Sequence, residues 1–83
     1  MKFPLYRKYS NNKSYFKVFS NDKFEEIQFL GKHCYIETFE AKILPDRNFI
    51  SDLIINNGGY WLSIDEKEYN DRINYCKQLK LKK

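Results

Sequence analysis

The alternation of hydrophobic and polar residues predicts strands over the first two-thirds of the chain. Residues 14–20 (Ser-Tyr-Phe-Lys-Val-Phe-Ser) combine aromatic and β-branched side chains, which favour extended backbone. Residues 23–30 alternate between apolar and polar positions, and residues 33–44 do so over a longer stretch. Short strands separated by turn residues are typical of an antiparallel sheet with one face toward the core.

Turn-forming residues predict where two further strands begin. Pro45–Asn48 is expected to form a type I turn, because proline presets φ and Asp46 can bond the following backbone. Phe49–Ile55 is then expected to be a strand. Asn56–Gly59 offers residues that tolerate positive φ, as a tight hairpin requires, and Tyr60–Leu62 is expected to be a short last strand.

The last part of the chain, about residues 64–81, is predicted to be a helix. Ser63 and Glu66 have the spacing of a capping box. One narrow apolar stripe follows at helical spacing: Tyr69, Ile73, Cys76 and Leu79. We therefore expect an α+β fold, a four- to five-stranded antiparallel meander with one C-terminal helix packed on one face.

The length of 83 residues allows one domain, 1–83, with strands within about 5–62 and a thin core. Uninterrupted apolar runs are too short to span a membrane, and the N-terminal residues lack the apolar region of a secretory signal. Cys34 and Cys76 are too few for a disulfide framework, so we expect two reduced thiols in a cytoplasmic protein.

Residue types for catalysis or metal binding are present but poorly arranged. His33 and Cys34 are adjacent in a predicted strand, so their side chains point to opposite faces and cannot pair. The chain has three Cys and His residues in all, whereas a structural zinc site needs four ligands. No glycine-rich phosphate loop occurs either. We therefore expect no enzyme activity, no metal and no cofactor.

Glu37 is the one carboxylate on the otherwise apolar face of residues 33–44, beside Tyr35 and Phe39. Partial desolvation there would suit a general acid. An ordinary salt bridge to a lysine or arginine is the favoured interpretation.

Charge is distributed unevenly within the net +4. Residues 1–23 hold six basic groups and one acidic, residues 24–71 hold four basic and ten acidic, and residues 72–83 hold five basic and none acidic. Basic ends with interleaved aromatic residues could bind nucleic acid. The candidate phosphate contacts are Lys13, Lys17, Arg72, Lys77, Lys80 and Lys82. The acidic middle would repel phosphate, and the RNA-recognition signature is absent, so nucleic acid ranks second.

A protein partner ranks first, because antiparallel sheets expose edge strands that can pair with another chain. Tyr60 and Trp61 are the candidate partner anchors, although the sequence favours Trp61 as a lid on the core. We expect a non-enzymatic protein-interaction domain without a membrane partner, present as a monomer or weak homodimer.

Four motifs carry a resemblance to known proteins: Tyr6–Tyr9, Phe24–Gln28, Ala41–Arg47 and Trp61. In these the chain resembles a group of small, uncharacterised bacterial proteins of similar length. The resemblance covers most of the chain and implies a self-contained single domain, and it implies no activity.

Overall fold

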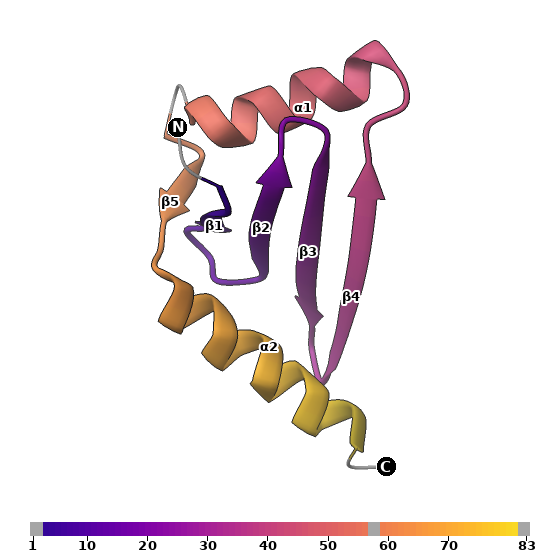
Figure 1. Ribbon diagram of the computed structural model, residues 1–83. Helices are drawn as coiled ribbons and strands as arrows, with labels where there is room; N and C mark the ends of the chain where they lie inside the picture. Colours follow the sequence, from indigo (N-terminus) through magenta and orange to yellow (C-terminus); the bar gives the residue numbers. More distant parts are fainter. Residues whose placement is uncertain (1–2, 57–58, 82–83) are drawn as a thin grey trace.

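The computed structural model describes residues 3–56 and 59–81, with side chains as far as residue 79. Five antiparallel strands form one sheet in the order β4-β3-β2-β1-β5, together with two helices (Figure 1). The elements are β1 (Leu5–Tyr9), β2 (Ser14–Ser20), β3 (Lys23–Leu30), β4 (His33–Glu40), α1 (Leu44–Ile55), β5 (Trp61–Ser63) and α2 (Glu66–Leu81). The predicted α+β class and antiparallel sheet are confirmed, whereas the expectation of a single helix is wrong.

The first four strands form a meander, and β2 and β3 have the predicted bounds. β4 ends at Glu40 rather than Leu44. The predicted hairpin into the last strand is wrong, because β5 pairs with β1, with Tyr9 opposite Trp61. Residues 57–58 of that hairpin lie outside the described part of the chain.

α1 replaces the predicted turn at 45–48 and the predicted strand at 49–55. Pro45 occupies the first turn of a helix, where its missing N–H costs nothing. Asp46 accepts a bond from the Lys42 N–H at 3.2 Å, and its charge suits the helix N-terminus. Asn56 ends the helix in the left-handed conformation, at φ +52°. Proline, aspartate and asparagine are common both in turns and at helix ends, so these residues alone do not distinguish a turn from a helix.

α2 begins later than the predicted capping box requires. Ser63 is the last residue of β5, and Asp65 caps the helix instead, since its Oδ1 accepts the Glu68 N–H at 2.8 Å. The cap is therefore an aspartate two residues later than predicted, and the Glu68 carboxylate pairs with Lys8 at 2.7 Å rather than with the Asp65 N–H.

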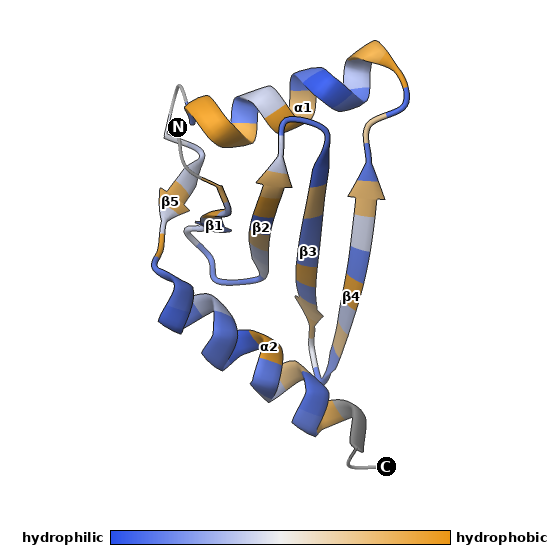
Figure 2. Cartoon of the chain, in the orientation of Figure 1, coloured by the Kyte–Doolittle hydropathy of each residue, from blue (hydrophilic) through white to orange (hydrophobic). Residues whose placement is uncertain are grey.

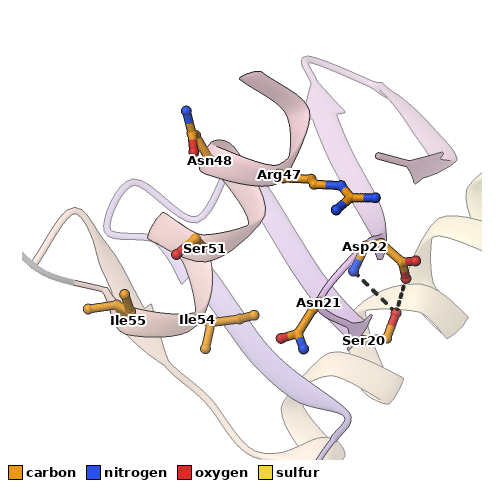
Figure 3. Close-up of a pocket in the computed structure, with 8 residues that line it drawn as sticks. All are labelled: Ser20, Asn21, Asp22, Arg47, Asn48, Ser51, Ile54 and Ile55. Atoms are coloured by element: carbon orange, nitrogen blue, oxygen red, sulfur yellow. Dashed lines mark hydrogen bonds between the residues drawn. The ribbon is translucent and has the colours of Figure 1, made fainter. Parts of the chain in front are cut away.

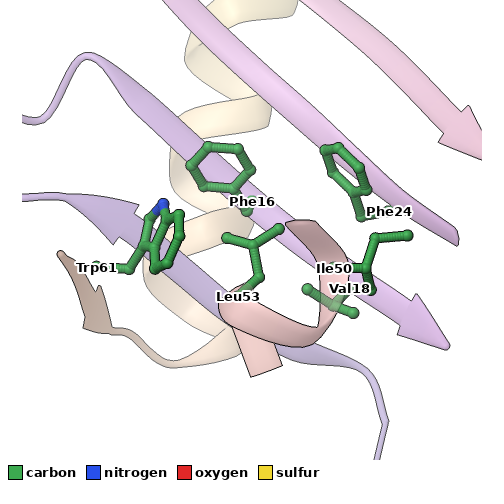
Figure 4. Close-up of a cluster of buried hydrophobic side chains, with 6 residues drawn as sticks. All are labelled: Phe16, Val18, Phe24, Ile50, Leu53 and Trp61. Atoms are coloured by element: carbon green, nitrogen blue, oxygen red, sulfur yellow. The ribbon is translucent and has the colours of Figure 1, made fainter. Parts of the chain in front are cut away.

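Two apolar clusters lie on opposite faces of the sheet, one with each helix, and Figure 4 shows the cluster beside α1. Alternate residues along each strand point to opposite faces, which appears in Figure 2 as alternating colours along β3 and β4. The first cluster includes Phe16, Val18, Phe24, Ile50, Leu53 and Trp61. The second consists of Tyr15, Ile27, Cys34, Tyr69 and Cys76, with Ile73 and Leu79 packed against it. All four positions of the apolar stripe on α2 thus belong to the second cluster.

Cys34 in β4 and Cys76 in α2 form a disulfide across 42 residues of sequence, so the expectation of reduced thiols is wrong. Their separation in sequence concealed a Cα–Cα distance of 5.8 Å in the fold. Among the described residues, no helix has both the length and the apolar character needed to span a bilayer.

Candidate functional site

The outer edge of β4 is the longest free strand edge of the sheet, since no other described strand pairs with it. The Ala41 N–H donates to the Asp22 carbonyl at 2.7 Å, toward β3. Backbone polar groups alternate in direction along a strand, so those of Ile36 and Thr38 point outward. Eight residues of extended backbone are long enough to template another strand.

Beside this edge lies a part of the sheet that α1 does not reach. In Figure 1, α1 crosses one end of the sheet, and the far ends of β3 and β4 extend beyond it. The strand register places one set of side chains on this side, which we call the open face: Glu26, Gln28, Leu30, His33, Tyr35, Glu37 and Phe39. Tyr35 is 47% exposed and Phe39 is 37% exposed. The open face thus presents aromatic surface directly next to free backbone groups.

Two carboxylates face each other at the centre of the open face. Glu26 in β3 lies directly opposite Glu37 in β4. Burial raises the pKa of Glu26 and the Glu37 charge raises it further, while a hydrogen bond from Ser14 acts in the opposite direction. Among the described residues neither carboxylate forms an ion pair, so the salt bridge expected for Glu37 is not formed. Like charges in direct cross-strand contact destabilise a sheet.

An apolar cleft of about 230 Å³ continues the open face toward α1. Phe39 stands between the two, because it belongs to the open face and also lines the cleft. Its ring stacks on Phe24 at a centroid distance of 4.9 Å, and the Phe49 ring of α1 lies tilted against Phe24 at 5.5 Å. Ala41 and Ile50 complete the apolar lining, and the acidic residues Glu40 and Asp46 line the cleft as well. The cleft has the size and character to receive one apolar side chain.

A larger hollow of about 670 Å³ lies between α1 and the β2–β3 turn (Figure 3). Its polar groups partly satisfy one another, because the Ser20 hydroxyl donates to Asp22 Oδ1 at 2.6 Å and accepts the Asp22 N–H at 3.4 Å. Arg47, Asn48 and Ser51 line the side formed by α1. None of the residues that line this hollow is buried, so we favour the β4 edge as the functional surface.

The two predicted partner anchors occupy different environments. Trp61 is 8% exposed and belongs to the first cluster, stacked beside Tyr9 at 6.1 Å, which is the core position that the sequence favoured. Its Nε1 is buried with no hydrogen-bond partner among the described residues. Tyr60 is 71% exposed and remains accessible to a partner.

Two of the predicted phosphate contacts lie on the α2 side of the sheet, because Lys17 shares a face of β2 with Tyr15 and Arg72 of α2 lies over the Tyr15 ring. Lys17 lies over the rings of Phe19 and Tyr6, at 5.2 and 6.0 Å, and Arg72 lies over different rings, among them Tyr15 at 5.6 Å. Lys13 and Lys77 are exposed, and neither shares an aromatic ring with these two. The side chain of Lys80 and the whole of Lys82 fall outside the described residues.

Acidic groups also surround Arg72. A hollow of about 370 Å³ holds Arg72 and Lys8 together with Glu68 and Asp71. Lys8 is paired with Glu68 at 2.7 Å. Phosphate would meet two carboxylates there, which disfavours this hollow as an anion site.

Sequence reasoning identified part of the β4 surface. The alternation of residues 33–44 placed Glu37 beside Tyr35 and Phe39, and the strand register agrees. It missed Glu26, which lies in the neighbouring strand. The pairing of Glu26 with Glu37 depends on the register between the two strands, and neither strand's sequence alone determines that register. It also missed the cleft, because Phe49 was assigned to a strand.

Comparison of the chain with protein-family models, with curated proteins and with solved structures gave no match.

Proposed function

We propose that the protein is a non-enzymatic interaction domain that binds an extended segment of another protein along the outer edge of β4. In this mode a peptide adds a strand to a sheet, main-chain hydrogen bonds supply affinity, and pockets for alternate side chains supply specificity. The observation that carries the proposal is the combination of an eight-residue free edge, an adjoining aromatic face and a cleft at its end.

β4 lacks the backbone features that usually block pairing at a sheet edge, which supports this function. Natural sheets usually blunt exposed edges with proline, bulges, lysine or very short strands. β4 has no proline or lysine, and its pairing with β3 is continuous over eight residues. The opposite edge, β5, is three residues long and fits the protected pattern. The backbone of this long edge is therefore available for pairing, while Glu37 and Glu40 disfavour pairing with acidic strands.

Thr38 allows a direct test, because its outward N–H can be removed without breaking a bond to β3. Proline is tolerated on an edge strand when its nitrogen faces solvent. Seven-residue peptides selected from a displayed random library should bind the wild type and Thr38→Ala equally. The same peptides should not bind the Thr38→Pro variant, provided that its circular dichroism spectrum shows that it is folded like the wild type. Peptides that bind Thr38→Pro as tightly as the wild type would refute the proposal. A selection that enriches no binding peptide would also refute it.

Nucleic acid remains the second candidate because of one local arrangement. Lys17 and Lys23 both lie over the ring of Phe19, at 5.2 and 5.6 Å. Cations around an aromatic ring are suited to a base and its phosphates. Labelled oligonucleotides should then bind at about 50 mM salt and lose affinity steeply by about 200 mM. Replacing both lysines by glutamine should weaken that binding, and no binding at the lower salt would exclude this candidate.

The proposed lack of catalysis is supported by the state of Cys34, which is held in a disulfide and so unavailable as a nucleophile. The cytoplasmic location stays a prediction that has lost one support, since disulfides persist mainly in oxidising compartments. Alkylation of free thiols in freshly lysed cells, followed by mass spectrometry, would decide which state the protein has in its host.

A further inference from the structure

The chemistry of the open face specifies what kind of segment fits the β4 edge, an inference that rests on the proposed function. We propose that the occupant is an extended segment of a different protein that pairs antiparallel with β4. It carries an apolar side chain and, two residues later, a basic one. The apolar side chain enters the cleft beside Phe39, and the basic one lies over the carboxylates of Glu26 and Glu37.

Strand geometry sets this spacing. Because the polar groups of Ile36 and Thr38 point outward, residues 35, 37 and 39 lie in the non-bonded pairs of an added strand. Opposed Cα atoms in such pairs are about 4.5 Å apart and their side chains share one face. An added strand therefore places one side chain beside Phe39 and another, two residues on, beside Glu37. Antiparallel pairing makes the residue beside Phe39 the earlier one in the segment.

The carboxylates explain the preference for a basic side chain. Glu26 and Glu37 lie opposite one another without a cation from the described residues. Glu26 lies two strand spacings, roughly 9.6 Å, from the added strand, so a lysine or arginine opposite Glu37 would have to extend past Glu37 to approach Glu26. The rings of Tyr35 and Phe39 flank Glu37 along β4 and can hold a cation against their faces. The segment would supply the countercharge that the sheet itself lacks.

The same charges disfavour a second copy of this chain. Antiparallel self-pairing centred on Glu37 would set this carboxylate opposite its own copy. Pairing centred on Ile36 would gather Glu26 and Glu37 of both copies, four carboxylates, around one axis. The first arrangement sets like charges directly opposite each other, and the second, in which Glu37 faces Tyr35 of the other copy, brings them together diagonally; both are unfavourable. Nucleic acid is disfavoured at this face for the same reason.

The test uses capped synthetic peptides and the complete protein. The probe is Thr-Thr-Leu-Thr-Arg-Thr-Thr, in which leucine and arginine share one face. The control, Thr-Thr-Leu-Thr-Thr-Arg-Thr, has the same composition but puts arginine on the other face. Binding is followed by fluorescence anisotropy and by amide chemical shifts of Ile36 and Thr38, at about 50 mM salt so that charge pairs are weakly screened. We expect the probe to bind at least tenfold more tightly than the control.

Protein variants separate charge recognition from edge pairing. Glu37→Lys should weaken the probe at least tenfold, and a probe with glutamate in place of arginine should then bind the variant better than the wild type. Glu66→Gln removes an exposed carboxylate on α2 and should change nothing. If Thr38→Pro does not fold, N-methylation of the peptide at its bonding positions tests the edge with the wild-type protein.

The outcomes distinguish the two proposals. Probe binding that survives Thr38→Pro and N-methylation would overturn edge pairing itself. Edge-dependent binding without preference for arginine or for its spacing would overturn only the present inference. A dimer in light scattering that Thr38→Pro dissociates would identify a second copy as the occupant and overturn it too. At about 1 mM probe, even a weak complex with a binding free energy of about −4 kcal/mol is half formed. No binding at that concentration would therefore also count against the present inference.

Discussion

Arg7 holds the C-terminal end of α1 against the sheet, and its removal should detach that end. From β1 its Nε donates to the Leu53 carbonyl at 3.1 Å and one Nη donates to the Ile54 carbonyl at 3.1 Å. The other Nη donates to the Tyr6 carbonyl at 3.0 Å. Burial lowers the pKa of Arg7, which nevertheless stays charged at any working pH. The guanidinium thus satisfies carbonyls that a helix end leaves unbonded and complements the helix dipole.

The expected loss for Arg7→Met, which keeps the aliphatic stem, follows from these bonds. Hydrogen bonds to charged groups contribute about 1.5–3 kcal/mol each, but the contributions do not add when the freed carbonyls regain water. Because Ile54 is only half-buried, we expect Arg7→Met to lower the free energy of unfolding by about 2–3 kcal/mol in total. For a domain of this size that corresponds to a Tm lower by about 8–24 °C. Arg7→Lys should lose about half as much, since one ammonium cannot span both helix carbonyls.

Urea unfolding followed by circular dichroism and Trp61 fluorescence measures the effect. Trp61 packs in the same cluster as Ile50 and Leu53 and so reports on the docking of α1. Arg47→Met is the matched control, because Arg47 is an exposed arginine of α1 and should change stability by less than about 0.5 kcal/mol. The reasoning is refuted if Arg7→Met lies within 0.5 kcal/mol of the wild type, or if the control is equally destabilised.

Three further predictions concern the disulfide and two perturbed side chains. Reduction, or replacement of both cysteines by alanine, should cost about 4 kcal/mol, as the chain-entropy model gives for 42 residues of separation, and an unchanged urea midpoint would contradict this. The Tyr69 hydroxyl donates to Glu25 at 2.6 Å. Burial, together with this bond, raises the pKa of Tyr69, so the native state holds the hydroxyl proton more tightly than the unfolded chain does. The contribution of the Tyr69 hydroxyl to stability is therefore complete below about pH 10 and is lost as pH rises further. Tyr69→Phe should lower the free energy of unfolding by about 1–2 kcal/mol at pH 7, and its stability, measured by urea unfolding, should fall less steeply at alkaline pH than that of the wild type. An alkaline profile parallel to that of the wild type would argue against this. Because the pKa of Glu26 is raised, its protonated form favours the native state below the unfolded pKa of about 4.3, and this stability disappears as pH rises through the native value. Glu26→Gln should consequently raise the free energy of unfolding by about 0.5 kcal/mol at pH 7, because it relieves the repulsion from Glu37, and should change it little near pH 4. A less stable variant at pH 7 would contradict the position of Glu26 opposite Glu37.

The sequence by itself determined the elements whose signals are local. The bounds of β3 followed from alternation of period two, because that pattern has no helical equivalent over eight residues, and those of β2 followed from its aromatic and β-branched side chains. The apolar stripe of α2 was equally clear, since positions three and four apart share a helix face. The same alternation placed Glu37 among aromatic residues before any contact was known.

The tertiary structure decided what local signals leave ambiguous. Residues 49–55 contain β-branched side chains, yet Phe49, Ile50, Leu53 and Ile54 also repeat at helical spacing, and burial of Ile50 and Leu53 against the sheet favours the helix. The free edge of β4, the carboxylate pair across β3 and β4, and the disulfide each depend on which distant segments become neighbours. Sheet order and register arise from the packing of the whole chain, and no single strand encodes them. The proposed binding surface is therefore a product of the assembled sheet, although each of its side chains was visible in the sequence.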